Sequence, residues 1–455
     1  MTAAESPSTK LSLRALLTLA WPIMLSRMSQ SVIGLSDVWL VADLGAAALA
    51  ATATGALNAF ALLILPIGVM FVVSSFASQL AGAGDVGGAR RFAWYGLVVA
   101  AFTQVGCIAV LPFVSWLVDH LPNEPEVQTL MRGYLMVRLL SGGAAVGIEA
   151  LSNFYGGLGR TRPGMVAAVS AMVLNVLGNV MFIDGRFGAP KLGVTGSALA
   201  STLATAVAFV GFFIYFLRDP HQPLGRLRVA EFLRLLRFGL PSGFNWLFEF
   251  LAFIFFVNVV VAGLGTEALA AMNAVFNLNS VAFMPAFGLA SACAIVVGQA
   301  IGAGRKDDVP AAIWLTVRST IAWEGFVGLF YLVAPALLMQ PFAKGPTGPQ
   351  VEALGVRMLL VSAAWQVFDA VATVMAESLR AAGDTLFPLV MRLAIAWLVF
   401  APGAYFSVTR LHWTEIGATG WMVAYLALLA ISLTIRYRTG RWRTVELIDP
   451  MASGH

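Results

Sequence analysis

The sequence has few charged residues for its length. Asp, Glu, Lys and Arg make up 11% of the 455 residues, and 59% are hydrophobic, whereas a soluble domain carries about 25% charged residues. No polar block long enough for a soluble domain separates the apolar runs. This composition excludes an ordinary soluble protein and indicates an integral membrane protein.

Cysteine and histidine are scarce. Cys107 and Cys293 both lie in apolar runs, and the four histidines fall in predicted loops or at the terminus. Neither disulfide nor metal chemistry is indicated, and the sequence contains no HExxH motif, Walker A loop or nucleophile elbow. We therefore expect a protein that is not an enzyme and has no cofactor other than a coupling ion.

Apolar runs of about 20 residues or more recur along the chain, and each can cross the hydrocarbon core of a bilayer. No cleavage site follows the first run, so we expect it to be a retained helix and not a signal peptide. The predicted spans are 13–41, 46–80, 91–118, 128–156, 163–184, 193–217, 232–262, 267–300, 310–340, 352–379, 386–408 and 415–436. The fold class is therefore all-α, with twelve transmembrane helices.

Basic residues gather in alternate loops, for example at Arg90–Arg91, Arg160 to Arg162 and Arg305–Lys306, and again after the last span. By the positive-inside rule these loops and both termini are cytoplasmic. We expect a multi-pass protein of the inner (plasma) membrane. The rule also accounts for the net charge of +5 without a nucleic-acid partner.

The two halves of the chain repeat each other. LGAAALAA at 44–51 recurs as LGTEALAA at 264–271, and QLAGAG at 79–84 recurs as QAIGAG at 299–304. The predicted organisation is a terminal segment 1–12, an N-lobe 13–217, a connector 218–231, a C-lobe 232–436 and a tail 437–455. Six spans in each repeat give parallel halves, which favours alternating access over a channel.

Three carboxylates inside predicted spans are the main functional candidates: Asp37, Glu249 and Asp369. A carboxylate near the middle of a bilayer costs about 2.5–3.5 kcal/mol on insertion scales, so it usually faces a bundle interior where an ion or proton neutralises it. The structural alternative is a hydrogen bond to a neighbouring helix. For Asp37, solvation near the interface is a further alternative.

Amide and hydroxyl groups inside the predicted spans are further candidate ligands. Asn175 and Asn179 are four residues apart on one helix face, and with Asp37 and Ser201 they offer the oxygen ligands that hard cations prefer. Ordinary interhelical hydrogen bonding, about 0.6 kcal/mol per bond, is the alternative. In the C-terminal half, the predicted substrate cavity comprises Asn245, Asn273, Asn277, Trp365 and Gln366.

Five further ionisable residues fall inside the predicted spans. Glu149 and Glu377 lie toward cytoplasmic ends, where solvent would reach them, whereas Glu324 has no such explanation. Arg27 and Arg138 would either pair with an intramembrane carboxylate or extend to an interface.

The sequence resembles the multidrug and toxic compound extrusion (MATE) family over about residues 15–435. The motifs that carry the resemblance are DVWLVADLGAAALAA, LGVTGSALAS after NVLGN, FNWLFEFLAF followed by LGTEALAAMNAV, and FDAVATVMAESLRAAGDT. The resemblance implies a two-lobed antiporter that exports cationic or amphipathic drugs in exchange for Na⁺ or H⁺. Within the family it is closest in pattern to the NorM-type branch, which has acidic residues on helices one, seven and ten.

The resemblance also implies site residues. Glu249 and Asp369 would form a C-lobe cation site, and Asp37, Asn175, Asn179 and Ser201 an N-lobe site. Two positions depart from the family pattern: some members have aspartate at Asn179, and Met272-Asn273 replaces a common His or Gln. We expect a monomer in contact with membrane lipid. The alternative function is a lipid-linked precursor flippase or polysaccharide exporter, which would be expected to need a basic cavity.

Overall fold

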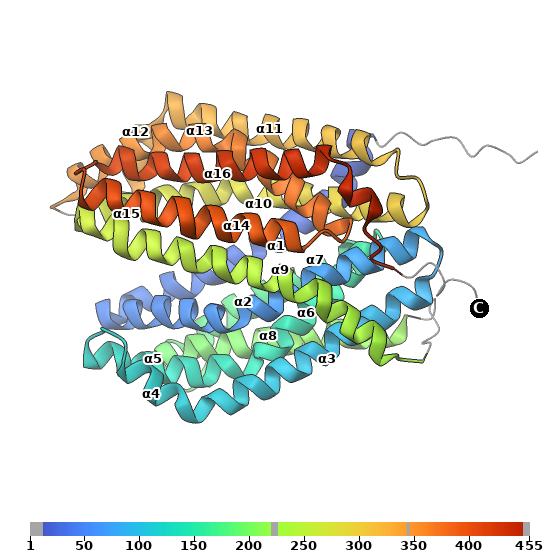
Figure 1. The fold of residues 1–455 in the computed structure, drawn as a ribbon. Helices are drawn as coiled ribbons and strands as arrows, with labels where there is room; N and C mark the ends of the chain where they lie inside the picture. The colour runs from blue at the N-terminus through green and yellow to red at the C-terminus, as the bar shows by residue number, and fades with distance from the viewer. Residues whose placement is uncertain (1–11, 220–225, 344–345, 449–455) are drawn as a thin grey trace, which may run out of the picture.

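The computed structural model describes residues 12–219, 226–343 and 346–448, and within them the chain is a bundle of helices in two lobes (Figure 1). The predicted fold class is confirmed. The terminal segment 1–12, the connector 218–231 and the tail 437–455 lie wholly or partly outside these residues.

The N-lobe comprises α1 Leu13–Val41, η1 Ala42–Leu44, α2 Ala46–Gly82, α3 Val86–Val110, η2 Leu111–Phe113, α4 Val114–Asp119, α5 Pro125–Arg138, η3 Leu139–Ser141, α6 Gly142–Gly157, α7 Arg162–Phe182, η4 Arg186–Gly188 and α8 Val194–Arg218.

The C-lobe comprises α9 Val229–Phe255, η5 Phe256–Val261, η6 Ala262–Leu264, α10 Thr266–Gly302, α11 Val309–Val333, α12 Pro335–Met339, η7 Gln340–Phe342, α13 Gly348–Ala381, α14 Leu386–Ala394, η8 Ile395–Phe400, α15 Ala401–Thr409, α16 Glu415–Arg438 and η9 Arg441–Thr444.

Ten helical segments in the described residues are long and apolar enough to cross a membrane, and the bent pair 309–333 and 335–342 makes eleven. The first helix, α1, is more polar but packs between α7 of its own lobe and α10 of the other. It completes the set of twelve. A helix satisfies its main-chain polar groups by hydrogen bonds within the segment, as the interior of a bilayer requires.

The ninth span was predicted as one segment, 310–340, and this is wrong in detail. The helix α11 ends at Val333, and the chain bends by 94° into the segment that begins at Pro335. Proline lacks an N–H and disfavours helical geometry in the residue before it, and Ala334 accordingly leaves the helical region with φ −134° and ψ 44°.

The repeat is visible in the contact between the lobes. Gln79 of α2 donates a hydrogen bond of 2.7 Å to the carbonyl of Ala381 in the C-lobe. Its repeat counterpart Gln299 of α10 donates one of 3.0 Å to the carbonyl of Gly157 in the N-lobe. We call this pair of contacts the glutamine latch. The two bonds of the latch are made by equivalent residues of the two repeats.

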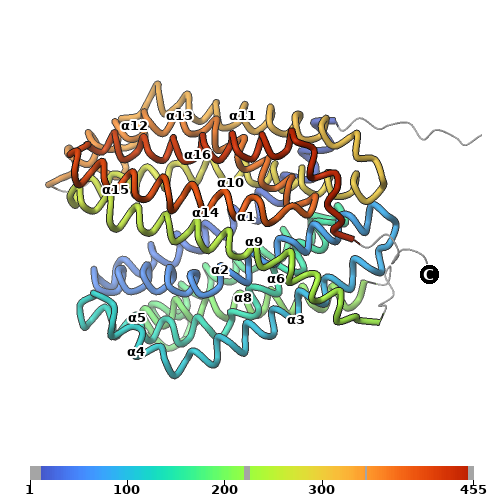
Figure 2. The backbone as a smooth tube through the Cα atoms, viewed as in Figure 1, coloured from blue at the N-terminus to red at the C-terminus, as the bar shows by residue number. Residues whose placement is uncertain are grey.

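Two glycines allow the latch to form. A Cβ on Gly82 would collide with the carbonyl of Gln299, and one on Gly302 would collide with the carbonyl of Gln79. The lobes meet at this end of the bundle and their helices diverge toward the opposite end (Figure 2).

Candidate functional site

In the N-lobe, three helices converge on Asp37. The α7 residues Asn175 and Asn179 donate amide hydrogen bonds of 2.9 and 2.6 Å to its Oδ1. On α8, the Ser201 hydroxyl donates a bond of 2.7 Å to Oδ2. All four residues are buried. The structure therefore brings together the complete N-lobe set predicted from the sequence, which we call the Asp37 cluster.

Small residues let the helices approach closely enough for these bonds. A Cβ on Gly178 of α7 would lie 2.9 Å from the Cβ of Ala200 on α8. Gly178 precedes Asn179 in the chain, and Ala200 precedes Ser201. Close packing at small residues is a common way for membrane helices to associate, and here it positions an amide and a hydroxyl on one carboxylate.

No salt bridge to Asp37 is present among the described residues, and its carboxyl group is held by hydrogen bonds. Asp37 is 5% exposed, so solvation at the interface is excluded as its explanation. The sequence patterns did not indicate Ser36, whose hydroxyl donates a hydrogen bond of 3.0 Å to Asn175 Oδ1. Within the described ranges, the Oδ1 atom of Asn179 and the hydroxyl of Ser197 are buried without partners.

In the C-lobe, Glu249 forms an ion pair with Arg392 of α14. The Glu249 side chain is 35% exposed and that of Arg392 11%. The sequence offered no basic partner nearby, because Arg392 lies in another span, and only the packing of α9 on α14 joins them. The charge of the Glu249 carboxylate is therefore balanced by the arginine side chain of Arg392.

The structure does not join Glu249 to Asp369 by any hydrogen bond or ion pair in the described chain. Asp369 of α13 is half-buried and receives a weak contact of 3.5 Å from Thr373. Glu324 of α11, in contrast, is 0% exposed. Its two carboxyl oxygens have no hydrogen-bond partner within the described residues.

The polar residues predicted for a substrate cavity separate into two groups. Asn273 and Asn277 are exposed, and the amide of Asn277 returns to the carbonyl of Asn273 at 2.9 Å. Trp365 and Gln366 are buried and both donate to Asn279 Oδ1, the tryptophan at 3.0 Å. Asn279 is therefore a hub that helical spacing did not single out, since its partners lie on another helix.

Asn245 belongs to neither group. It is half-buried, and its Oδ1 atom has no partner among the described residues.

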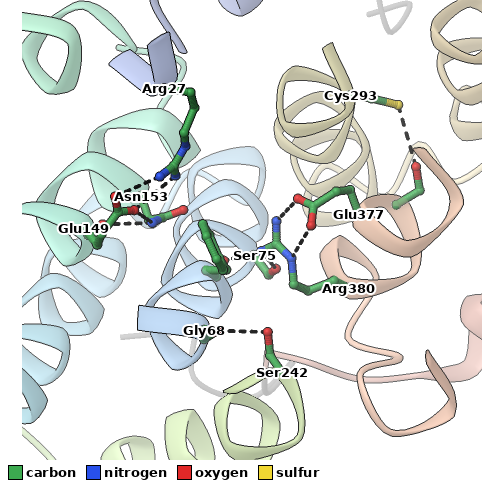
Figure 3. Close-up of polar contacts among 11 residues, drawn as sticks. Arg27, Gly68, Ser75, Glu149, Asn153, Ser242, Cys293, Glu377 and Arg380 are labelled. Carbon is green, nitrogen blue, oxygen red and sulfur yellow. Dashed lines mark hydrogen bonds and ion pairs between the residues drawn. The ribbon is translucent and has the colours of Figure 1, made fainter. Parts of the chain in front are cut away.

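Glu149 and Glu377 are buried and paired, so the expectation that solvent reaches them is wrong. Arg27 makes two hydrogen bonds to Glu149, of 2.9 and 3.1 Å. Arg380 binds Glu377 one turn away and also the carbonyl of Phe71 in the other lobe. Figure 3 shows the two pairs on either side of α2. Helix packing thus replaces solvent as the partner of both carboxylates.

A cavity of about 50 Å³ lies beside these pairs, between α1, α2, α6, α7, α10 and α13. Arg27 and Arg380 line it together with Ser74, Asn153 and Ser291. None of the five residues predicted for the substrate cavity contributes to it. The other basic candidate, Arg138, donates a hydrogen bond of 2.7 Å to the hydroxyl of Ser141.

Chemically, the Asp37 cluster suits a small monovalent ion or a proton. It supplies one carboxylate, two amides and a hydroxyl, whereas divalent sites usually gather several carboxylates. Within the described ranges, no group of three or more His, Cys, Asp or Glu side chains could hold a metal ion.

Comparison with known proteins identifies the family. The MatE family model matches residues 22–181 and 241–406, one segment in each lobe. The chain belongs to the MatE family. The resemblance inferred from its motifs, including the NorM-type branch, is confirmed.

Named relatives of this MatE protein match it along nearly its whole length. It is 30% identical over 452 residues to the "Probable multidrug resistance protein NorM" of Pseudomonas putida, covering 97% of this chain and 96% of that protein. A protein of the same name from Thermotoga maritima is 27% identical over 436 residues, covering 94% and 93%.

Solved structures share the MatE fold. A crystal structure of MATE in complex with MaL6 superposes with a TM-score of 0.87 at 22% identity, covering 95% of this chain and 97% of that one. A MOP superfamily transporter from Pyrococcus furiosus, described as having a binding pocket of reverse polarity, gives 0.85 at 22% identity, covering 95% and 96%. At this identity the likeness shows the fold alone.

Proposed function

We propose that the protein is a secondary active multidrug efflux antiporter that exports cationic or amphipathic compounds in exchange for Na⁺ or H⁺. The observation that carries the proposal is the Asp37 cluster, in which a buried carboxylate is held by three hydrogen bonds and no salt bridge in the described chain. The relatives named as multidrug resistance proteins support the substrate class.

The coupling step follows from charge. A carboxylate inside the bilayer attracts a cation strongly because little solvent screens it. When Asp37 takes up a proton or Na⁺, the Asp37 cluster loses its negative charge and with it its affinity for a cationic drug. Drug and ion would thus compete for one charge, and the ion gradient would drive export.

In the C-lobe, a cationic drug would compete with an arginine for a carboxylate. Glu249 is one-third exposed and its partner is Arg392. A cationic drug that reaches Glu249 must displace this guanidinium, so affinity depends on both side chains. Asp369 has no salt bridge among the described residues and offers the other C-lobe charge for the coupling ion. We retain both carboxylates as proposed cation ligands.

Alternating access would use the glutamine latch as the closed end. The latch lies at the ends of α2 and α10, next to the basic loops that we assign to the cytoplasm. Closure there with divergence at the other end corresponds to an outward-facing arrangement. We place both termini on the cytoplasmic side of the inner membrane.

One structural observation favours the alternative function, a lipid-linked precursor flippase. Arg27 and Arg380 line the cavity between the lobes, and arginine is suited to phosphate groups. Each guanidinium is already paired, with Glu149 and Glu377 respectively. A phosphate would have to displace a carboxylate, so we favour drug export.

The test is ethidium transport into inside-out vesicles under a Na⁺ gradient or a proton gradient imposed separately. Wild type is compared with Asp37→Asn, Glu249→Gln and Asp369→Asn, and Asp43→Asn serves as the control because its carboxylate is exposed. We expect transport under one gradient, lost in Asp37→Asn, reduced in the two C-lobe variants and retained in the control. Transport that persists in Asp37→Asn contradicts the proposal, as does its absence from wild type under either gradient.

A further inference from the structure

Glu324 is the most isolated carboxylate in the described part of the bundle. It lies near the middle of α11, about 22 Å along the helix axis from its first residue at 1.5 Å per residue. It is 0% exposed, and neither carboxyl oxygen has a hydrogen-bond partner in the described ranges. A bare charge at such a position is costly, so the side chain requires a ligand.

The packing of α11 on α13 shows where Glu324 faces. Gly328, one turn further on the same helix face, lies against α13: a Cβ there would be 3.5 Å from both the Ala363 carbonyl and Gln366 Cγ. Because the two helices are antiparallel, Glu324 faces the next turn of α13. That turn contains Asp369.

Nearby hydrogen-bond donors do not neutralise this carboxylate. The main-chain amide of Ala370 lies near it but does not make a hydrogen bond of acceptable geometry. Thr320, one turn back, donates its hydroxyl to a carbonyl of its own helix at 2.9 Å. Tyr331 donates to a carbonyl of α10, also at 2.9 Å. Both hydroxyl protons are therefore already used.

Few other charges face Glu324 from the elements packed against it. The helix α12 has no ionisable side chain, and those of α10 are Glu267 in its first turn and the buried Cys293. On α11 itself, Arg318 is exposed. The remaining ionisable residues of α13 are Glu352, Arg357, Glu377 and Arg380. Arg380 pairs with Glu377, and Arg357 with Glu415, so Asp369 is the relevant neighbour.

A second unpaired polar group lies on α16, which also packs against α13. Tyr425 of α16 is 6% exposed, and its hydroxyl has no partner in the described chain. Unpaired polar atoms therefore lie on two helices, α11 and α16, that both pack against α13. Buried polar groups normally have partners, so a missing small ligand is indicated.

We propose that Glu324 and Asp369 form a proton-binding pair in the C-lobe. One proton would be shared between the two carboxyl groups and a second would be exchanged with solvent through Asp369. The proposal rests on the antiporter function above and assigns H⁺ as the coupling ion of this lobe.

A proton fits the pair better than Na⁺. Hard cations bind several oxygen ligands at once, and the main-chain carbonyls of α11 and α13 are used within their regular helices. A proton needs one oxygen to bind and one to accept the resulting hydrogen bond, and the pair supplies both. With two protons bound the pair is neutral; loss of one leaves a negative charge that attracts a cationic drug.

Infrared spectroscopy of the purified full chain tests the pair without relying on transport. A protonated carboxyl group has a C=O stretching band that disappears on ionisation. We expect wild type to show such a band that disappears as the pH is raised, and Glu324→Gln to lose it. Thr320→Val is the control, because it changes the same helix face without a carboxyl group. An unchanged band in Glu324→Gln overturns the proposal, as does a band that responds to Na⁺ and not to pH.

A binding experiment links the pair to function. Tetraphenylphosphonium is titrated into wild type, Glu324→Gln and Asp369→Asn in weak buffer with a pH indicator. One linked proton changes the dissociation constant about tenfold per pH unit. We expect wild type to release a proton on binding and both variants to release less. Equal release in wild type and Glu324→Gln overturns the link.

The two experiments separate the two claims. If wild type binds no tetraphenylphosphonium but shows the carboxyl band that Glu324→Gln removes, the antiporter function fails and the proton pair stands. If wild type transports and the band is unaffected by Glu324→Gln, the pair fails and the antiporter function stands.

Discussion

At the scale of single residues, the orientation of two amides decides what the Asp37 cluster can bind. Asn175 and Asn179 present their NH₂ groups to the carboxylate, which suits an ionised Asp37. A bound Na⁺ would require amide oxygens in those places. The Oδ1 atom of Asn179 is buried without a partner in the described chain, so rotation of this amide would supply such an oxygen without moving a helix.

Removal of one donor should weaken coupling. Ser201→Ala deletes the 2.7 Å bond to Asp37, and a hydrogen bond to a charged group contributes about 1.5–3 kcal/mol. We expect ethidium transport to fall roughly tenfold or more, since 1.4 kcal/mol corresponds to tenfold. Thr205→Ala is the matched control, because its hydroxyl bonds only to the carbonyl of its own helix. Equal rates in the two variants would exclude a role for Ser201.

Loss of the Asn279 hub should act on stability. Asn279→Leu leaves the buried donors of Trp365 and Gln366 without their acceptor, and an unsatisfied buried donor costs about 1–3 kcal/mol. We expect a melting temperature several degrees lower in detergent. Asn277→Leu is the control, since this asparagine is exposed on the same helix. If the two variants have the same melting temperature, the Asn279 hub does not stabilise the protein.

At the scale of helices, the α7–α8 contact determines whether the Asp37 cluster exists. Close approach at Gly178 and Ala200 places Asn179 beside Ser201. A second contact fixes the start of α8, where a Cβ on Gly196 would meet the carbonyl of Phe182. The cluster therefore depends on residues that have no polar group.

Widening that contact should disrupt the cluster. Gly178→Val would push α8 away from α7 and lengthen the bond between Ser201 and Asp37. We expect loss of transport together with a lower melting temperature. Gly211→Val lies on α8 with no atom within 4 Å of its added Cβ, so it should behave as wild type. Normal transport by Gly178→Val would show that the cluster tolerates separation of these helices.

At the scale of the whole molecule, the two lobes are joined by a symmetric contact. The glutamine latch uses one glutamine from each repeat, and each glutamine donates its hydrogen bond to the opposite lobe. The nearby bond from Arg380 to the carbonyl of Phe71 adds a contact on one side only. Opening of this end must break these contacts.

Obstruction of the latch should shift the conformational equilibrium. Gly302→Val places side-chain atoms against the carbonyl of Gln79, so we expect this end of the bundle to open. Spin labels at Arg162 and Asp308, which are exposed near this end, should report a longer distance than in wild type. Gly106→Val, with no atom within 4 Å of its Cβ, should leave the distance unchanged. An unchanged distance in Gly302→Val would mean that the latch does not hold this end closed.

Local composition and repetition in the sequence determined much of this protein. Apolar runs predicted the spans, because a bilayer admits helices of a narrow range of lengths. The offset of 220 residues between Gln79 and Gln299 predicted two parallel halves. The members of the Asp37 cluster were also predicted, since Asn175 and Asn179 share a helix face, Asp37 is an intramembrane carboxylate and Ser201 adds a hydroxyl oxygen.

Only the tertiary structure decided which polar groups are paired. Glu249 with Arg392, Glu149 with Arg27, and the Asn279 hub all join residues on different helices. Helical periodicity specifies which residues share a face but not which helix that face meets. The isolation of Glu324 has the same origin, because a carboxylate lacks a partner only when every neighbouring helix fails to supply one.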